Sequence, residues 1–303
     1  MIKYSIIIPH YNSPNLLVRC LNSIPVREDI QVIVVDDCSP DAKSYIDRYK
    51  ELSRPYLELY STGTNGGGGK ARNVGLLYAK GEWVLFADAD DYFVDSFVDI
   101  LEKYSSNSAD IVFFNVRCFN EAGKEVRGIK EKLYELYEQR GDERAFRYCY
   151  TEPWGKMFRR SLIADIDIRF EEVIVANDFL FSVKTGYYAK EIIISKEYLY
   201  NYTVMISSTS RGKMPEKKVV ARLVEKVKVQ KFLESHGIKT NYNLLSYVPR
   251  MKMFFPIIRR NEIEVFQDMG YSIWVVLKDR IRLLFNKLLN NRVDLDSNAR
   301  AFK

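Results

Sequence analysis

Short apolar runs alternate with amphipathic stretches over the first third of the chain. Residues 4–8, 31–35 and 83–87 have the length and apolar character of buried strands, and residues 56–60 alternate like a half-exposed strand. A helix is predicted to begin at Pro14, because proline fits the first helical position and apolar residues then recur at helical spacing. Strand followed by helix, repeated along the chain, predicts a parallel sheet with helices on its faces.

Weaker patterns extend this prediction. Helices are expected over residues 41–52, 94–104 and 177–189, and a further buried strand over residues 110–116. Residues 117–150 are mostly charged and rich in tyrosine, with weak periodicity. No internal repeat or low-complexity tract interrupts the pattern.

The chain becomes helical in character from Glu216 onward, and its last third carries much of the Lys and Arg. The net charge of +6 fits an anionic partner, such as nucleic acid, a phosphorylated substrate or an anionic membrane surface. Apolar residues between Trp274 and Leu288 form one helical face surrounded by basic residues. Such a helix can lie in a membrane interface, or it can dock on the rest of the protein; the sequence leaves both interpretations open.

Composition restricts the class of protein. Of the 303 residues, 47% are hydrophobic and 28% are charged, which indicates a soluble globular protein with a sizeable core. Four cysteines without CxxC spacing predict reduced thiols in a cytosolic protein. Two histidines argue against a His-rich zinc site or a Ser-His-Asp triad, although His10 stays open as a base. No signal peptide is expected, and no apolar run approaches the ~20 residues that cross a bilayer.

Polar clusters follow the predicted strands at the points where the strands end. Residues 9–12, Asp36-Asp37 and residues 88–91 each come directly after an apolar run. Right-handed crossovers place the carboxyl ends of parallel strands on one rim of the sheet, and ligands bind at that rim in open α/β folds. The shared location of the three clusters indicates a nucleotide site.

Three carboxylates, Asp88, Asp90 and Asp91, end the apolar run at residues 83–87. Carboxylates this close repel one another unless a cation lies among them, and oxygen ligands suit Mg²⁺ or Mn²⁺ bridging to substrate phosphates. We therefore predict a metal-diphosphate site here. The alternative is a solvated acidic turn in which Asp91 or Asp95 caps the next helix.

A glycine-rich segment, residues 65–73, lies before the acids. Its glycines let backbone N–H groups approach a ligand, and Lys70 and Arg72 lie where a helix begins, with a dipole that favours anions. A phosphate-binding P-loop is excluded because Thr64 and Ala71 stand where it needs glycine and a hydroxyl residue. A dinucleotide fingerprint fits loosely but follows the wrong strand, so a dehydrogenase is disfavoured.

Two positions in the second half of the chain have two interpretations each. Trp154, beside Gly155, can offer an aromatic face to a sugar ring or can be a half-buried structural residue. Asp178 opens a predicted helix, where it can act in catalysis or can simply complement the helix dipole.

Six segments, in this order and spacing, resemble family 2 glycosyltransferases of the bacterial polysaccharide-assembly type: SIIIPHYN, VIVVDDCSP, NGGGGKARNVGL, GEWVLFADADD, WGKMFRRSLI and ANDFLF. The resemblance implies a GT-A fold, an α/β architecture with a mostly parallel central sheet, flanking helices and, here, a helical C-terminal extension. It implies a catalytic domain over residues 1–215, with a nucleotide-sugar half at 1–115 and an acceptor half at 116–215. Residues 216–303 would form the helical region.

The resemblance also implies individual roles. The residues expected to bind the nucleotide-sugar are Pro9, Tyr11, Asn12, Asp37, Lys70, Arg72 and Asp88. Asp90 would be the principal ligand of a Mn²⁺ or Mg²⁺ ion, with Asp88 beside it. Asp178 would be the general base for the acceptor hydroxyl, and Trp154 and Lys156 would border the acceptor.

The implied reaction is an inverting, metal-dependent transfer of a sugar from a nucleotide-diphospho-sugar, expected to be a UDP-sugar, to a hydroxyl group of a saccharide. The acceptor is expected to be lipid-linked, in the synthesis of a surface polysaccharide such as capsule or O-antigen, at the cytoplasmic face of the membrane. Direct displacement needs one ionised carboxylate and no second nucleophilic acid. No nucleic-acid partner is expected.

Two features depart from the family pattern, and two other functions stay open. Asn177 stands where the family usually has Glu, and no histidine occurs near residue 210, where Ser207–Lys213 would have to contact the phosphates. The chain could instead be a non-catalytic nucleotide-sugar-binding scaffold, which would need Asp90 but no base at Asp178. A sugar nucleotidyltransferase is disfavoured because no GxGxR loop follows the first strand.

Overall fold

The computed structural model describes residues 1–41, 49, 54–128, 130–204 and 216–238. The chain forms two compact units, Met1–Lys213 and Met214–Lys303. Three predicted features lie outside the described residues: most of the helix over 41–52, the loop Ser207–Lys213 and the amphipathic stretch from Trp274 to Leu288.

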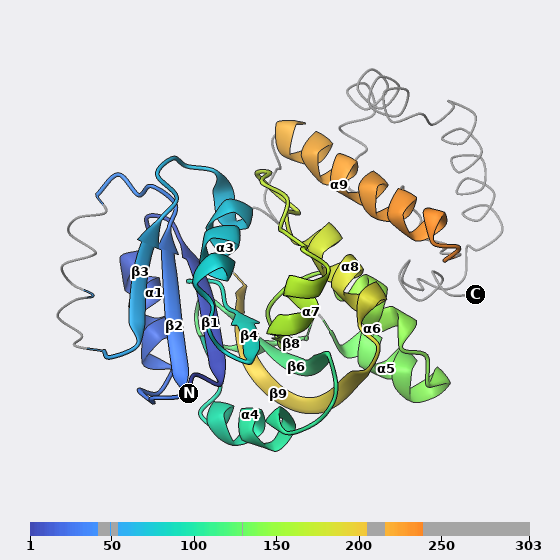
Figure 1. The fold of residues 1–303 in the computed structure, drawn as a ribbon, viewed down its shortest axis with the longest axis horizontal. Helices are drawn as coiled ribbons and strands as arrows, with labels where there is room; N and C mark the ends of the chain where they lie inside the picture. The colour runs from blue at the N-terminus through green and yellow to red at the C-terminus, as the bar shows by residue number, and fades with distance from the viewer. Residues whose placement is uncertain (42–48, 50–53, 129, 205–215, 239–303) are drawn as a thin grey trace. The chain divides into compact units, whose positions relative to one another are not determined.

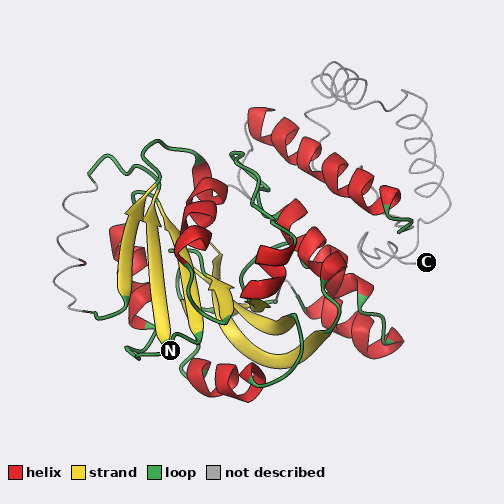
Figure 2. Ribbon diagram, viewed as in Figure 1, coloured by secondary structure: helices red, strands yellow, loops and turns green. Residues whose placement is uncertain are grey.

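The first unit is a nine-stranded sheet with helices packed on it (Figures 1 and 2). Its strands are β1 (Tyr4–His10), β2 (Ile30–Asp36), β3 (Leu57–Ser61), β4 (Trp83–Phe86), β5 (Tyr92–Phe93), β6 (Ile111–Asn120), β7 (Glu125–Val126), β8 (Lys156–Arg159) and β9 (Ile192–Val204). Its described helices are α1 (Pro14–Asn22), α3 (Gly67–Tyr78), α4 (Phe97–Ser105), α5 (Glu131–Arg140), α6 (Arg144–Cys149), α7 (Arg160–Asp165) and α8 (Phe179–Tyr188).

The N-terminal half of the sheet is parallel, as the sequence predicts. Strands β3, β2, β1 and β4 lie side by side in that order, and Ile7 of β1 pairs with Ile33 of β2 and Phe86 of β4. Ile6, Ile7 and Ile8 are completely buried, because both faces of a parallel sheet are covered. The carboxyl ends of β1, β2 and β4 therefore meet at one edge.

The other half of the sheet is mixed, with antiparallel pairs added to the parallel ladders. Strand β8 pairs antiparallel with both β4 and β6, whereas β9 runs parallel to β6. The sequence pattern did not predict β8 or β9. Strand β9 is irregular in register, with shifts opposite Phe113 to Val116, and Figure 1 shows that it curves strongly. A bent strand with register shifts does not keep a simple two-residue alternation of buried and exposed side chains.

Four phenylalanines join the two halves of the sheet to α8. The Phe86 ring of β4 packs edge-on against Phe158 of β8 and Phe181 of α8, with centroid distances of 5.9 and 5.7 Å. Phe170 stacks on Phe181 at 3.9 Å. This cluster fixes the segment before α8 against the edge of the sheet where β4 ends.

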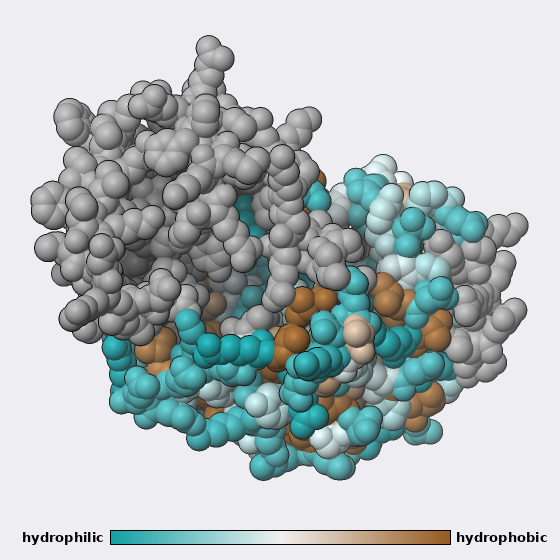
Figure 3. Space-filling view, turned by 180° about the vertical axis from the view of Figure 1, so that it is seen from behind, coloured by the Kyte–Doolittle hydropathy of each residue, from teal (hydrophilic) through white to brown (hydrophobic). Residues whose placement is uncertain are grey.

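Other predictions are tested by the same structure. The strand predicted over residues 110–116 is confirmed as β6, and the helix predicted over 94–104 is α4, which begins at Phe97. The stretch with weak periodicity contains α5 and α6. All four cysteines are free thiols, as expected. The described surface is largely hydrophilic in Figure 3, with hydrophobic residues scattered over it.

The second unit contains α9 (Glu216–Ser235) among its described residues, which confirms a helix from Glu216 onward. None of the helices in the described part of the chain combines the length and the apolar character that crossing a bilayer requires.

Close packing of α8 on α6 gives a first prediction. A Cβ atom at Gly186 would lie 2.2 Å from the carbonyl oxygen of Arg147, so Gly186→Ala must push the helices apart. Overpacking of this kind lowers the free energy of unfolding by ~1–3 kcal/mol. Alanine recovers up to ~1 kcal/mol through its higher helix propensity, so we expect a net loss of stability. Urea unfolding followed by circular dichroism measures this. Leu77→Ala, at a side chain 67% exposed, is the control, and an unchanged stability of Gly186→Ala would contradict the packing.

Candidate active site

Three acidic side chains converge in the turn that follows β4. The turn is closed by a hydrogen bond from the Asp91 amide to the Asp88 carbonyl oxygen at 3.1 Å. One carboxylate oxygen each from Asp88, Asp90 and Asp91 lies within 4.8 Å of the others, as the metal-site prediction requires. The β4 register beside β1 places this turn at the edge where β1 ends.

Asp91 differs from the other two acids because it is completely buried. Its Oδ1 accepts a hydrogen bond of 2.7 Å from the Thr203 amide of β9, and its Oδ2 has no hydrogen-bond partner among the described residues. Burial, together with the charges of Asp90 and Asp88, raises the pKa of Asp91 well above its ordinary value. Asp91 therefore ties the turn to β9.

Asp88 and Asp90 are half-buried. The Asp88 amide donates to the Tyr200 hydroxyl at 2.8 Å, and the Arg72 guanidinium donates to Asp88 Oδ1 at 2.5 Å. Burial, followed by repulsion from Asp88, raises the pKa of Asp90 to about 6. The Arg19 guanidinium donates to the Asp90 carbonyl oxygen and, at 2.9 Å, to Thr203 Oγ1.

The acidic turn fits a hard divalent cation. Among the described residues, Arg72 supplies the one direct ion pair to these three carboxylates, and burial together with their mutual repulsion raises the pKa values of Asp90 and Asp91. One carboxylate oxygen of the cluster, Asp91 Oδ2, is buried without a hydrogen-bond partner among the described residues. Carboxylate oxygens are the ligands that Mg²⁺ and Mn²⁺ prefer, and an oxygen without a hydrogen-bond donor is available to such an ion.

Asp37 holds the start of α3. Its Oδ1 accepts from the Gly66 amide at 2.9 Å, and its Oδ2 accepts from the Gly67 amide at 2.6 Å. A carboxylate is favourable at a helix N-terminus, where amide donors are unpaired. These two amides of the glycine segment therefore bind a protein carboxylate in this structure. Nearby, Lys70 donates to Thr64 Oγ1 at 2.6 Å.

The loop after β1 is held by a buried histidine. His10 Nδ1 bonds to Asp36 Oδ1 at 2.9 Å, and His10 Nε2 accepts from the Ser13 amide at 3.2 Å. Both ring nitrogens are thus engaged, which argues for a structural His10. Pro9 pairs within β1 with Val35, and Asn12 adopts a positive φ of 47°. The turn leaves the Tyr11 ring 50% exposed at the edge of the sheet.

Asp178 lies at the N-terminal end of α8, within electrostatic reach of the acidic turn. Burial raises its pKa to about 6, Arg72 opposes that shift, and Glu152 and Asp88 add to it. The neighbouring Asn177 accepts a 3.0 Å hydrogen bond from Arg72. The tertiary structure therefore brings Asp178 to the group that contains Asp88 and Arg72.

Trp154 and Lys156 are buried rather than presented on an open surface. Trp154 is 3% exposed and stacks between Tyr200 and Tyr202, with centroid distances of 5.5 and 5.3 Å. Lys156 donates to the Tyr150 carbonyl oxygen at 2.5 Å, and burial holds its pKa well below the ordinary value. Trp154 supports the Tyr200 ring, whose hydroxyl bonds to the acidic turn.

Three residues that contact the turn were not predicted from the sequence: Arg19, Tyr200 and Thr203. Tyr200 and Thr203 belong to β9, a strand whose pattern gave no signal. Arg19 lies on a helix that was predicted, but only the fold brings its guanidinium to the turn. A search for partners of the acids therefore needed the tertiary structure.

Comparison with known proteins identifies the family. Residues 5–167 match the family model described as Glycosyl transferase family 2. The poly(ribitol-phosphate) beta-N-acetylglucosaminyltransferase TarS of Staphylococcus aureus is 33% identical over 67% of this chain and 35% of TarS. The poly(ribitol-phosphate) beta-glucosyltransferase of Bacillus spizizenii is 31% identical over 67% of this chain and 32% of its own. The chain thus spans about a third of the length of these curated relatives.

Solved structures agree with the sequence relatives. The crystal structure of S. aureus TarS 1–349 in complex with UDP-GlcNAc matches with a TM-score of 0.69 and 26% identity, over 88% of this chain and 80% of that one. The mannosyltransferase PcManGT from Pyrobaculum calidifontis, in complex with GDP-Man and Mn²⁺, shares the fold with a TM-score of 0.51 and 19% identity, over 77% of this chain and 64% of that one. The chain belongs to glycosyl transferase family 2, a family of glycosyltransferase enzymes, and has their GT-A fold.

Proposed function

We propose that the protein is an inverting, metal-dependent glycosyltransferase that moves a sugar from a UDP-sugar to a hydroxyl group of a saccharide acceptor. The observation that carries the proposal is the position of Asp178, a half-buried carboxylate with a pKa of about 6, beside Arg72 and Asp88. A nucleotide-sugar-binding scaffold would need the acidic turn, but it would have no use for a poised base there.

On the donor side, Asp90 and Asp88 would hold a Mn²⁺ or Mg²⁺ ion. A divalent cation at this position supplies charge neutralisation for the diphosphate leaving group. The expected UDP is supported by the crystal structures of S. aureus TarS 1–349 in complex with UDP-GlcNAc and with UDP. Pro9, Tyr11 and Asn12 would form the nucleobase site, with the exposed Tyr11 ring available for stacking.

Three more residues complete the donor side of the proposal. Asp37 would act there through the start of α3, since its carboxylate holds the Gly66 and Gly67 amides. Lys70 is half-buried near that helix start, where a cation favours a phosphate. Arg72 would influence the donor through its ion pair with Asp88.

On the acceptor side, Asp178 would accept the proton of the attacking hydroxyl. The acceptor oxygen forms a bond to the anomeric carbon as the bond from that carbon to the leaving phosphate oxygen breaks, with inversion of configuration. A base with a pKa near the working pH is efficient in such a step. Trp154 and Lys156 are both buried, so they would support the acceptor site from the protein interior. The half-buried Glu152 belongs to the same segment and pairs with Lys130.

The biological setting is also a proposal. The named relatives act on poly(ribitol-phosphate), which supports an acceptor in a cell-surface polymer, and we propose a lipid-linked saccharide at the cytoplasmic face of the membrane. The catalytic domain would comprise residues 1–215, with halves 1–115 and 116–215, followed by the helical region 216–303. A basic helix between Trp274 and Leu288 would give peripheral membrane association.

Replacement of the proposed base separates binding from catalysis. Asp178→Asn should bind a UDP-sugar with Mn²⁺ as the wild type does, because the acidic turn is intact, but should lower the rate of transfer by ~10²–10⁴-fold. Thermal shift measures binding, and release of UDP in the presence of acceptor measures transfer. Asp165→Asn, at an exposed position of α7, is the matched control. Parallel loss of binding and transfer would contradict the assigned role.

The raised pKa of Asp178 predicts the pH dependence of transfer. The base must be ionised to accept a proton, and it is protonated below its pKa of about 6. Transfer, as kcat/KM, should be constant above about pH 7 and fall tenfold per pH unit below about pH 6. Initial rates between about pH 5 and 8 measure the profile. An acid limb near pH ~4, the ordinary range of an exposed aspartate, would be the contradicting result.

Metal dependence is tested on the acidic turn. A panel of UDP-sugars with Mn²⁺ should raise the melting temperature of the wild type for one donor, because a ligand at ~100 times its Kd stabilises the folded state by ~2.7 kcal/mol. EDTA or Asp90→Ala should abolish the shift, whereas Asp99→Ala, exposed on α4, should keep it. A shift that survives EDTA would rule out the proposed metal site.

A further inference from the structure

We propose that Asn177 is a positioning residue whose amide oxygen holds the Arg72 guanidinium between Asp88 on the donor side and Asp178, the proposed base. One buried positive charge would then serve two carboxylates that lie far apart in the sequence. The inference rests on the proposed function, because it takes Asp178 as the base.

The contacts of Arg72 are the first evidence. Its side chain is buried, with the residue 6% exposed, and it donates from Nη2 to Asp88 Oδ1 at 2.5 Å and from Nη1 to Asn177 Oδ1 at 3.0 Å. The guanidinium carbon lies 5.4 Å from the centre of the Phe170 ring. Two hydrogen bonds in different directions and a ring contact leave a planar guanidinium little freedom to rotate.

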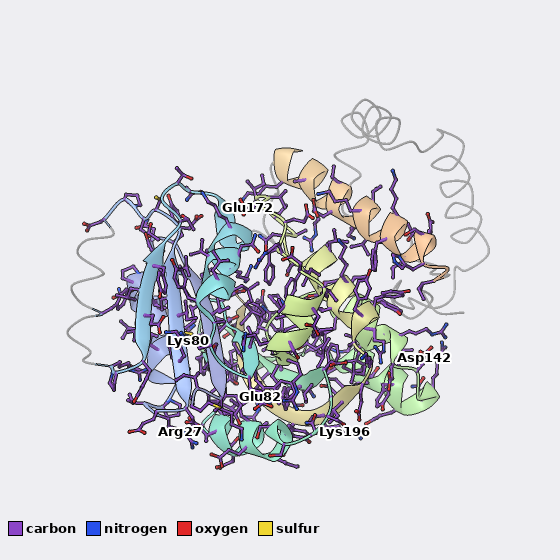
Figure 4. The ribbon with its side chains drawn as sticks, in the orientation of Figure 1. Arg27, Lys80, Glu82, Asp142, Glu172 and Lys196 are labelled. Atoms are coloured by element: carbon purple, nitrogen blue, oxygen red, sulfur yellow. The ribbon has the colours of Figure 1, made fainter. Side chains whose placement is uncertain are left out.

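The position of Asn177 is set by the packing of its segment on α3. Asn73 of α3 donates from Nδ2 to the Phe170 carbonyl oxygen at 2.9 Å and accepts at Oδ1 from the Phe170 amide at 2.8 Å. A Cβ atom at Gly69 would lie 2.2 Å from the Glu171 carbonyl oxygen, so only glycine permits this approach. Figure 4 shows Glu172 beside α3, in agreement with its 3.2 Å contact to Asn73.

The segment also closes on itself before α8. The Glu171 amide donates to the Asn177 carbonyl oxygen at 3.1 Å, and Ala176 adopts a positive φ of 57°. The Asn177 side chain is therefore held with its amide oxygen toward Arg72, one residue before Asp178. Loss of the amide would leave Asp88 as the remaining hydrogen-bond partner of the guanidinium within the part of the chain that the structure describes.

The position of Arg72 matters for Asp178 through charge. Arg72 lowers the pKa of Asp178, whereas Glu152 and Asp88 raise it, and Asp178 in turn acts on Lys156. The amide oxygen of Asn177 orients the guanidinium by a hydrogen bond.

A double-mutant cycle on Arg72 and Asn177 tests the inference. Asn177→Ala should lower kcat about tenfold and leave the donor KM within about twofold, because the guanidinium keeps Asp88 but loses its second anchor. The double variant Arg72→Lys/Asn177→Ala should have the same kcat as Arg72→Lys alone. The lysine cannot bond to both Asp88 and Asn177, so removal of the Asn177 amide then has no further effect. Asn177→Ser replaces the alanine variant if the latter does not fold.

A buried arginine elsewhere provides the matched control. Arg147 donates from Nη1 to the carbonyl oxygens of Gly186 and Ala189, at 2.8 Å each. Arg147→Lys should lower the melting temperature without changing the donor KM, as expected of a purely structural contact.

Two results would overturn the role of Asn177: effects of Arg72→Lys and Asn177→Ala on kcat that multiply in the double variant, or an unchanged kcat in Asn177→Ala. Failure of the proposed function can be distinguished from failure of this inference. If Asp178 is not the base, Asp178→Asn transfers sugar at the wild-type rate, whatever the result of the double-mutant cycle.

Discussion

The buried guanidinium of Arg72 connects two parts of the chain that the fold must bring together. Asp88 belongs to the turn after β4, and Asn177 belongs to the segment before α8. Burial of a cation is costly unless protein oxygens replace the water that it loses. Asp88 and Asn177 must therefore both be in place around the guanidinium. Glycines at the start of α3 let the segment before α8 approach closely enough for Asn177 to reach Arg72.

Strand β9 holds the acidic turn from the other side. Its Thr203 amide binds Asp91, and its Tyr200 hydroxyl accepts from the Asp88 amide, while Trp154 stacks on the Tyr200 ring. Asp91 thereby lies in the interior, whereas Asp88 and Asp90 are only half-buried. Three acids that look equivalent in the sequence thus have two different physical roles.

Local patterns predicted the parallel half of the sheet well. Uninterrupted apolar runs such as Ile6–Ile8 are typical of strands in a parallel sheet, which is covered on both faces. The mixed half escaped prediction because β8 is short and β9 is bent, with register shifts in its pairing with β6. Helices α5 and α6 were missed because residues 117–150 carry aromatic and charged side chains without a clear helical period.

The sequence by itself determined the edge of the sheet where β1, β2 and β4 end, the acidic turn that follows β4 and the order of motifs that resembles the family, because each depends on residues close together along the chain. Only the tertiary structure decided which acid is buried, that Asp37 binds the start of α3, and that Trp154 lies in the packed interior. It also decided that Asp178 meets Arg72 and Asp88. These are contacts between distant segments, and their geometry follows from packing and burial, which no local spacing records.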